Sequence, residues 1–278
     1  MRKWLIRVGA ALAASAIAFA AIVWIGSELV LRKSYAGIPA VAPAVPGDIE
    51  SGKHWAAILG CTSCHELALQ GSVMEDEDFW MGSLVAPNVT IQRKLYDDAG
   101  LTRLIRDGVK HDGRGVDTMP SKAFHHASDQ TIADVIAFVR SVPDSGEAQP
   151  KISYGPLARW NFLTGEWKLG PDEIEHKAAR IGDESLVQGA PSGRYIAVLA
   201  CGECHGLDQK GDPGGGIPNL AVAKAYSLEE FTNLMRNGEA KGGRKIRPMM
   251  AQTARRRFSA FSDAEIVALK SFLDAREP

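Results

Sequence analysis

The sequence has few of the features that define a disulfide scaffold, a disordered chain or a nucleic-acid-binding protein. It contains 4 cysteines in 278 residues and has a formal net charge of −1. So few cysteines exclude a disulfide-stapled fold, and the balanced charge gives no reason to expect nucleic acid as a partner. Hydrophobic residues make up 45% and charged residues 23% of the chain, which excludes a disordered chain and a polytopic membrane protein.

Long apolar runs are also scarce, and the only one lies at the N-terminus. Val8 to Ile25 is free of charged residues. As a helix this run would extend roughly 27 Å, close to the thickness of the hydrocarbon core of a bilayer. A cleaved signal peptide usually has a shorter apolar region that ends at small residues, whereas Ala18 and Ala20 lie inside this run. We therefore expect residues 1–33 to form an uncleaved transmembrane anchor.

The basic residues around this run predict its orientation. Three precede it and two follow it: Arg2, Lys3 and Arg7, then Arg32 and Lys33. The excess on the first side favours a cytoplasmic N-terminus, so we expect a single-pass protein of the inner membrane with the rest of the chain in the periplasm. Residues 34–48 are rich in alanine and proline, which favour an extended spacer. At about 3.1 Å per residue this tether would reach roughly 45 Å and hold the globular part away from the membrane.

After residue 48 one pattern of residues occurs twice. A segment that starts at Gly52 leads into Cys61-Thr62-Ser63-Cys64-His65, and a segment that starts at Gly193 leads into Cys201-Gly202-Glu203-Cys204-His205. Further along the chain, the same residue types return in the same order in both copies. These matches are Pro87-Asn88 with Pro218-Asn219, Arg106-Asp107-Gly108 with Arg236-Asn237-Gly238, and Met119 with Met249-Met250.

Each copy closes with a segment whose apolar residues have helical spacing. Five positions of the first copy correspond to five of the second at a constant offset: Ser128, Ile132, Val135, Phe138 and Val139 match Ser262, Ile266, Leu269, Phe272 and Leu273. Ser262 and Glu265 form a capping box. We expect one domain at residues 49–143, a connector at 144–188 with a short helix near residues 172–180, and a second domain at residues 189–278.

Paired cysteines at this spacing serve three kinds of chemistry. A redox dithiol needs a thioredoxin-like βαβ context, which these helical, glycine-rich segments do not offer. A structural zinc site could use four cysteines but would not need a histidine after each pair. Covalent haem attachment uses all five positions, because both sulfurs reach the vinyl groups of one porphyrin and the histidine ligates the iron. The sequence therefore predicts two haem c groups, one on Cys61, Cys64 and His65 and one on Cys201, Cys204 and His205.

With these motifs, residues 49–278 resemble dihaem c-type cytochromes, which have two tandem class I cytochrome c domains. The resemblance implies an all-α fold with two tandem cytochrome c-like haem domains behind the N-terminal transmembrane helix. It also implies a proline that braces the proximal histidine through its carbonyl group, here Pro87 and Pro218, and a methionine as the sixth iron ligand. In the first copy Met119-Pro120 fits the family pattern closely. In the second copy Ala251 replaces the proline.

The sixth ligands are predicted from spacing. Met119 follows Pro87 by 32 residues, and Met250 follows Pro218 by the same interval, although the interval from Gly238 favours Met249. We therefore expect the iron ligands to be His65 with Met119 and His205 with Met250. Histidine ligation in the first copy is the alternative, since three histidines flank Met119, and it would lower the reduction potential. These are His111, His125 and His126, of which the last two are expected at the surface.

An iron with both axial positions filled transfers electrons but does not readily bind a substrate. The sequence therefore predicts an electron carrier of a respiratory chain and not an enzyme. Its partners would be a donor dehydrogenase or quinol-oxidising complex and an acceptor oxidase or soluble cytochrome. One alternative is an electron-transfer subunit of a larger membrane dehydrogenase or respiratory complex. Another is a dihaem peroxidase, against which the methionines argue.

Charge differs between the two copies and suggests where partners dock. Residues 47–150 contain 16 acidic and 9 basic residues, a net charge of −7, whereas residues 171–278 contain 15 of each. A basic cluster surrounds the predicted methionine ligand of the second copy: Arg236, Lys241, Arg244, Lys245, Arg247, Arg255, Arg256 and Arg257. Our hypothesis is that this cluster docks an acidic partner, and the acidic run Glu75-Asp76-Glu77-Asp78 would suit a basic one. The alternative is an ordinary solvated surface in both places, and for the acidic run it is the one we favour.

Overall fold

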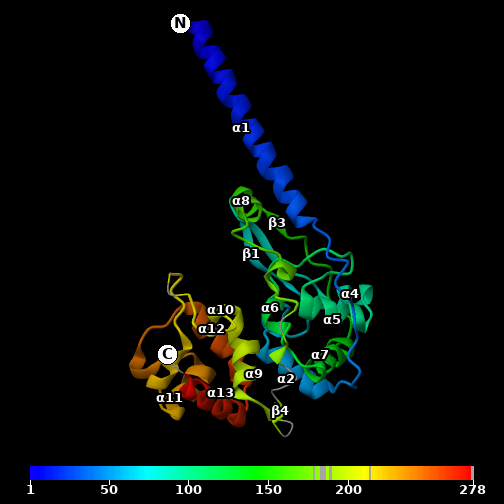
Figure 1. The fold of residues 1–278 in the computed structure, drawn as a ribbon, viewed down its shortest axis with the longest axis vertical. Coiled ribbons are helices and arrows are strands. Elements are labelled where there is room, and N and C mark those ends of the chain that lie inside the picture. The colour runs from blue at the N-terminus through cyan, green and yellow to red at the C-terminus, as the bar shows by residue number, and fades with distance from the viewer. Residues whose placement is uncertain (178, 182–185, 188–189, 213, 277–278) are drawn as a thin grey trace.

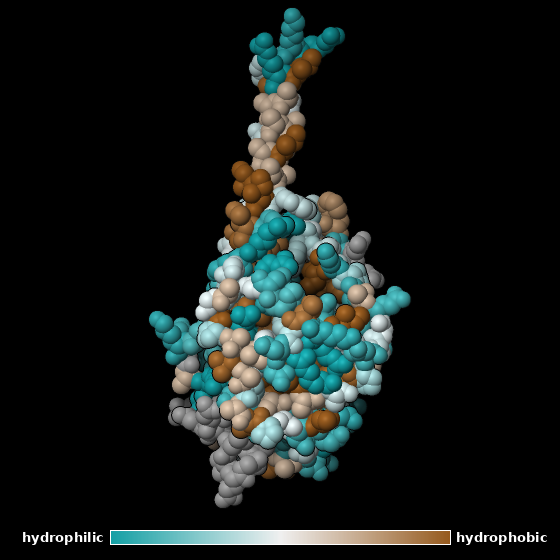
Figure 2. Space-filling view, turned by 90° about the vertical axis from the view of Figure 1, so that its right-hand side faces the viewer, coloured by the Kyte–Doolittle hydropathy of each residue, from teal (hydrophilic) through white to brown (hydrophobic). Residues whose placement is uncertain are grey.

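The computed structural model places a long N-terminal helix above two helical units (Figure 1). The first unit comprises residues 49–143 and the second residues 189–278. It describes residues 1–278 except 178, 182–185, 188–189, 213 and 277–278, and only the backbone of 75–77, 186–187 and 190–191. Helix α1 spans Arg2–Leu31 and is long and apolar enough to cross a membrane, a property that it shares with signal sequences. Apolar side chains cover much of its length, and basic ones lie at its tip (Figure 2).

The C-terminal part of α1 packs against helix α8 (Pro156–Thr164). The guanidinium of Arg159 lies over the ring of Trp24, with its carbon 3.6 Å from the ring centroid, and donates to Ser27 Oγ at 3.0 Å. The rings of Phe19 and Trp160 are in contact, with centroids 5.7 Å apart. Arg159 is buried in this contact, so α1 and α8 are held together. We call this contact the base of α1.

Residues 34–48 lie against the first unit and are not the free spacer that we expected. The backbone N–H of Tyr35 donates to the carbonyl of Gly113 at 2.8 Å, and Tyr35 Oη donates to Asp172 at 2.5 Å. Further along, Gln130 donates to the carbonyl of Pro46 at 2.9 Å. The alanines and prolines do give an extended chain, but its two ends are hydrogen-bonded to the unit beside it, so we call residues 34–48 the strap.

The first unit is a bundle of short helices around its Cys-x-x-Cys-His segment. Its core is the contact between α2 and α7, which lie at the two ends of the unit's sequence. Ser128 caps α7 by accepting from the N–H of Thr131. The helices are α2 (Ile49–Ile58), α3 (Cys61–Cys64), α4 (Val89–Gln92), η1 (Arg93–Leu95), α5 (Asp98–Asp107), α6 (Ser121–Phe124) and α7 (Asp129–Ser141).

The second unit repeats this arrangement, with α9 packed on α13. The predicted capping box of Ser262 and Glu265 is confirmed at the start of α13. The helices are α9 (Gly193–Ile196), the π-helix η4 (Ala197–Cys201), α10 (Gly202–His205), η5 (Leu220–Ala225), α11 (Leu228–Asn237), η6 (Lys241–Gly243), α12 (Pro248–Arg256), η7 (Phe258–Ala260) and α13 (Asp263–Ala275).

The helix contact at the heart of each unit uses equivalent residues. A Cβ atom at Gly52 would collide with the carbonyl of Asp134 and with Phe138, and one at Gly193 would collide with the carbonyl of Ala268 and with Phe272. The partners in α7 and α13 are related by the same offset of 134 that relates the apolar positions in the sequence. Glycine is therefore required at both places because the two helices cross almost backbone to backbone.

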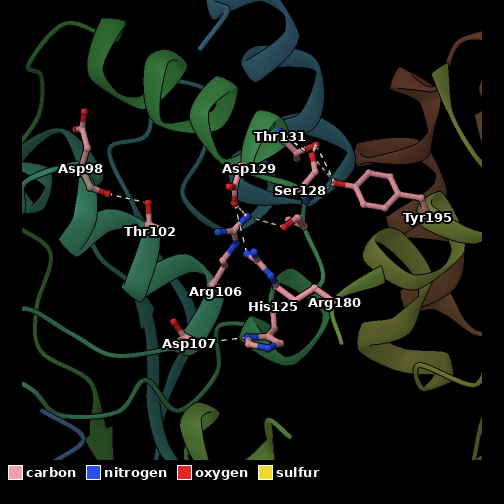
Figure 3. Close-up of polar contacts among 11 residues, drawn as sticks. Asp98, Thr102, Arg106, Asp107, His125, Ser128, Asp129, Thr131, Arg180 and Tyr195 are labelled. Carbon is pink, nitrogen blue, oxygen red and sulfur yellow. Dashed lines mark hydrogen bonds and ion pairs between the residues drawn. The ribbon is translucent and has the colours of Figure 1, made fainter. Parts of the chain in front are cut away.

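The two units share one hydrophobic core, and the contact between them is reciprocal. Tyr195 Oη of the second unit accepts from the N–H of Ser128 and donates to Thr131 Oγ1, both at 2.8 Å, at the start of α7 (Figure 3). In return, His54 Nε2 of the first unit lies 2.8 Å from the carboxylate of Glu265 at the start of α13. Each unit thus places one polar side chain on the N-terminal turn of the other's last helix, as in an isologous interface.

Two small sheets depart from the predicted all-α fold, although the chain is mostly helical. Strands β1 (Ser72–Asp78) and β2 (Gly82–Ala86) form an antiparallel hairpin, and β3 (Ser153–Tyr154) pairs with β2. Strands β4 (Leu186–Val187) and β5 (Ala190–Pro191) pair with each other. The hairpin occupies the longer interval between His65 and Pro87.

The connector does not stand apart from the first unit. Strand β3 completes the hairpin sheet, and Asn88 Nδ2 donates to the carbonyl of Ser145 at 2.8 Å. The short helix predicted near residues 172–180 is wrong, because the described residues there form only η2 (Gly170–Glu173) before irregular chain. The connector's helix is α8, whose N-terminus begins at Pro156, a residue suited to a first helical turn.

Candidate haem-attachment sites

The first Cys-x-x-Cys-His segment follows a sharp break between two helices. Gly60 adopts a left-handed conformation, with φ of 85°, and this turn separates α2 from α3, which carries both cysteines. Burial raises the pKa of the Cys61 thiol to about 11 and also raises that of Cys64. Both cysteines are therefore neutral thiols at pH 7 in the free chain, placed one helical turn apart.

The histidine of this segment is fixed by a single hydrogen bond. His65 Nδ1 lies 2.8 Å from the carbonyl oxygen of Pro87. A carbonyl oxygen only accepts, so Nδ1 carries the proton and Nε2 has a free lone pair. Burial lowers the pKa of His65, which keeps the ring neutral. A neutral imidazole whose other nitrogen donates to a backbone carbonyl is the usual form of a metal-binding histidine.

The second segment reaches the same arrangement by a different route. The chain continues through the π-helix η4 into α10 without a left-handed residue before Cys201. His205 is 9% exposed, burial lowers its pKa, and its Nδ1 lies 2.9 Å from the carbonyl oxygen of Pro218. Burial also raises the pKa of Cys201 to about 12 and that of Cys204.

These two donor sets fit haem c. Each offers two thiols one helical turn apart and one neutral imidazole nitrogen that faces no hydrogen-bond partner among the described residues. Pro87 and Pro218 accept the hydrogen bonds from the two histidines. They are the prolines that the family resemblance implies for this role. A redox disulfide or a zinc site would use the cysteines but would leave the fixed histidines without a role.

The methionines differ in exposure. Met119 is partly buried against the hydrophobic core, on the turn that precedes α6. In α12, Met250 is also packed against the core, whereas Met249 is 70% exposed. Adjacent residues of a helix point about 100° apart, so only one of the pair faces the interior. The structure therefore favours Met250 over Met249, and ligation by Met119 and Met250 stays a prediction.

The alternative histidine ligands are engaged elsewhere. His111 is exposed and lies edge-on to Tyr96. His125 and His126 are 9% and 8% exposed, so the expectation that they lie at the surface is wrong. The Nδ1 atom of His125 is 3.1 Å from Asp107, and that of His126 is 3.4 Å from the backbone N–H of Ile181. They are buried because the connector covers them.

A contact that the sequence did not indicate brings the two attachment segments together. Arg257 Nη1 of the second unit donates to Glu203, between the second pair of cysteines, at 2.6 Å. The same guanidinium packs against Gly60, directly before the first pair, and its positive charge opposes the burial that raises the pKa of Cys64. One ion pair thus lies between both segments, and the side chain of Arg257 is only 14% exposed.

This contact changes the interpretation of the basic cluster. Arg257 is part of the contact between the units and is not available for docking a partner. Arg255 and Arg256 are exposed in the last turn of α12, close to Met250 in the sequence. Arg236 is paired with Asp263 at 2.6 Å. In the acidic run, the side chains of Glu75, Asp76 and Glu77 lie outside the described residues.

Comparisons with known proteins agree with this site. Residues 192–276 match the family model described as cytochrome c. A relative from Cereibacter sphaeroides named diheme cytochrome c-type is 27% identical over 259 residues, which covers 77% of this chain and 84% of the relative. The second unit is therefore a cytochrome c domain, and the similarity implies covalently bound haem c and electron transfer.

Proposed function

We propose that this chain is a membrane-anchored, periplasmic dihaem cytochrome c that passes single electrons between protein partners of a respiratory chain. The observation that carries the proposal is the repeated site. Two Cys-x-x-Cys-His segments each have a histidine fixed through Nδ1 to a proline carbonyl, at 2.8 Å and 2.9 Å. The first unit, residues 49–143, and the second unit, residues 189–278, each hold one haem c in this proposal.

The residues of each unit have distinct roles. The four cysteines would hold the two haems covalently, and His65 and His205 would each offer a nitrogen to the iron. Met119 and Met250, both packed against the core, would offer the sulfur ligands. When bound, each haem supplies an iron that gains and loses one electron. Bound in this way, the methionines would keep water and substrates from the iron, which is why we propose a carrier and not a peroxidase.

The contact between the units supports a relay within one chain. Arg257 packs against Gly60, directly before the first attachment segment, and is ion-paired to Glu203 in the second. The shared core and the reciprocal contacts of Tyr195 and His54 hold the units in one arrangement. The two attachment sites would therefore keep a fixed position relative to each other, as a relay within one chain requires.

The base of α1 supports a membrane-anchored arrangement. Cleavage after the apolar run would remove Trp24 from Arg159, a buried cation, and cleavage beyond Ser27 would remove Ser27 as well. Trp4 and Trp24 are 66% and 57% exposed and about 30 Å apart along the helix. This spacing suits aromatic residues at the two faces of a bilayer.

Exposed apolar residues continue outward from this base. The tip of the β1–β2 hairpin carries Phe79 and Trp80, which are 74% and 60% exposed. The carbonyl of Trp80 accepts from the N–H of Leu157 in α8 at 2.9 Å, so the tip and α8 are joined. We place this side of the first unit at the outer surface of the membrane.

The first experiment is a spectroscopic one on the oxidised protein, made with the haem-maturation machinery. We expect two covalently bound haems per chain, each with the low-spin near-infrared and EPR signature of histidine–methionine ligation. A high-spin haem would show an open iron and favour peroxidase chemistry. A bis-histidine signature would overturn the assignment of the methionines.

The docking proposal has its own test. Arg255→Gln combined with Arg256→Gln should slow electron exchange with an acidic redox protein at low salt and leave it unchanged at high salt. Lys177→Gln, at an exposed position of the connector, is the matched control. An unchanged rate at low salt would show that the acidic partner does not dock on α12.

A further inference from the structure

Three side chains outside the attachment segments lie close together where the connector packs on the first unit. Asp107 is the last residue of α5, His125 directly follows α6, and His176 lies in the connector. Asp107 Oδ1 is 3.1 Å from Nδ1 of His125 and 3.4 Å from Nδ1 of His176. Figure 3 shows the ring of His125 turned toward Asp107. Asp107 and His125 are largely buried, with 15% and 11% of their side chains exposed.

The second ring nitrogen of His176 makes a hydrogen bond that fixes the position of its proton. This bond shows that a positive charge is needed between His176 and Asp107. His176 Nε2 lies 3.1 Å from the carbonyl oxygen of Pro171 and must donate to it. A neutral His176 therefore presents the lone pair of Nδ1 to a carboxylate oxygen, which is a repulsive contact. Either a second proton on the ring or a cation between the atoms is needed to make it attractive.

The distances between the three atoms favour a metal ion. Ligands bound at about 2.0–2.1 Å in a tetrahedron are roughly 3.3–3.4 Å from each other. The two distances to Asp107 Oδ1 are 3.1 Å and 3.4 Å, and all three possible ligand atoms lie within 4.8 Å of one another. The bond from His176 Nε2 to a backbone carbonyl is the outer-shell contact that orients metal-binding histidines.

The position of Asp107 adds an electrostatic reason. Its carboxylate is at the C-terminal end of α5, immediately before Gly108, which ends the helix in a left-handed conformation. The C-terminus of a helix carries partial negative charge, so a carboxylate there is unfavourable unless a cation lies beside it. The neighbouring Arg106 hydrogen-bonds to Asp129 and to the carbonyl of Ala127, and no hydrogen bond joins it to Asp107 among the described residues.

We propose that Asp107, His125 and His176 bind a divalent transition-metal ion of the Zn²⁺ type, with the fourth position open to solvent beside the exposed His176. Two imidazoles and a carboxylate are a known ligand set for zinc. The bound ion would join the end of α5, the end of α6 and the connector. Because α6 directly follows Met119-Pro120, this clamp would steady the segment that carries the proposed axial methionine.

The second unit provides an internal contrast. Asn237 occupies the position of Asp107, and its amide donates to Asn233 at 2.6 Å. The sequence contains no histidine after His205. The site therefore belongs to the first unit, where the connector supplies a ligand that the repeated frame does not have.

Zinc titration of the complete, tag-free haem-loaded protein tests the proposal. Haem loading occupies His65 and His205, so these residues do not compete for zinc. After treatment with EDTA, we expect calorimetry to show one saturable Zn²⁺ site per chain. We expect Asp107→Asn and His176→Ala to weaken binding by more than about tenfold, which is the loss that follows even the removal of an outer-shell partner. His111→Ala, at an exposed histidine outside the cluster, is the control and should bind as the unaltered protein does.

Two further measurements make the result independent of folding defects. Zinc should raise the melting temperature of the unaltered protein and of His111→Ala, but not that of His176→Ala, whose side chain is near the surface. X-ray absorption at the zinc edge, which does not overlap that of iron, should show nitrogen and oxygen ligands at about 2.0–2.1 Å. Absence of a saturable site, or equal affinity in the variants and the control, would overturn the proposal and identify the cluster as an imidazolium–carboxylate pair.

Discussion

The two units share a frame but differ in what is added to it. The histidine and its bracing proline are 22 residues apart in the first unit and 13 apart in the second. The extra residues of the first unit form the β1–β2 hairpin, and the strap and α8 pack on the same unit. The second unit has none of these additions and carries exposed arginines on α12 instead. The comparison teaches that the repeat keeps the attachment segments while the additions differ: the first unit carries the contact with α1, and the second carries the exposed arginines proposed for docking.

The largest expected effect separates the two attachment segments. Replacing Cys61 and Cys64 with alanine, or Cys201 and Cys204 with alanine, should each leave half of the covalently bound haem, because each segment holds its own group. Haem absorbance after alkaline pyridine treatment, together with intact mass, measures this content. Loss of all haem from one double variant and none from the other would show that the two units are not equivalent carriers.

The next effect concerns the axial ligand of the second unit. Met250→Leu keeps the side-chain volume but removes the sulfur, so one haem should lose its methionine signature and its potential should fall. The shift should be on the order of 0.1 V, within the range of about 0.8 V that axial ligands span. The neighbouring Met249→Leu, at a position 70% exposed, should change neither the near-infrared spectrum nor the potential. The reverse result would exchange the roles of the two methionines.

A smaller effect tests one half of the reciprocal contact between the units. Tyr195→Phe removes a buried hydroxyl group that bonds to Ser128 and Thr131. The N–H of Ser128 then loses its partner, and the free energy of unfolding should fall by about 1–2 kcal/mol. Thermal unfolding of the haem-loaded protein measures the loss. Tyr226→Phe is the control, because that hydroxyl contacts only Arg244 within the described residues and its removal should cost less.

The smallest effect tests the other half of the reciprocal contact, the pair of His54 and Glu265, through the pH dependence of stability. The hydrogen bond to Glu265 raises the pKa of His54 above its ordinary value of 6.5. Burial alone would raise the pKa of Glu265, but the bonds from His54 and Ser262 outweigh it and lower the pKa below 4.5.

The sign of the pH dependence follows from these two shifts. The contribution of His54 is complete below 6.5 and is lost as the pH rises through its raised pKa. The contribution of Glu265 is present above 4.5 and is lost as the pH falls through its lowered pKa. Between pH 4.5 and pH 6.5 we expect the free energy of unfolding of His54→Gln to be about 0.5 kcal/mol lower than that of the unaltered protein. The effect is small because the pair is partly exposed. A flat difference from pH 4 to pH 9 would show that the pair is not ionised.

The sequence predicted the repeated frame because that frame depends on local rules. Helical spacing, the serine caps at Ser128 and Ser262, and the five-residue attachment motif are all visible without tertiary contacts. The offset of 134 between the last helices returns in the contacts of Gly52 and Gly193. The second unit's assignment to cytochrome c has the support of the family comparison.

Features that depend on long-range contacts were not visible in the sequence. Residues 34–48 have the composition of a spacer, and only the three-dimensional structure shows Gln130 bonding to Pro46. The hairpin was missed because its strands are short and irregular in register. The unequal interval from His65 to Pro87 was the one signal of an insertion. His125 and His176, and the pairing of Arg257 with Glu203, are far apart in sequence and meet only through packing.

The packing of α1 on α8 has a mechanical consequence. Arg159 stacks on Trp24 and donates to Ser27, so α1 and the first unit move together as one rigid body. A membrane helix tilts when its apolar length exceeds the thickness of the bilayer. In the membrane-anchored arrangement proposed above, a thinner bilayer would therefore tilt α1 and move the second unit with it. The thickness of the bilayer would then set the height at which a partner meets the second unit.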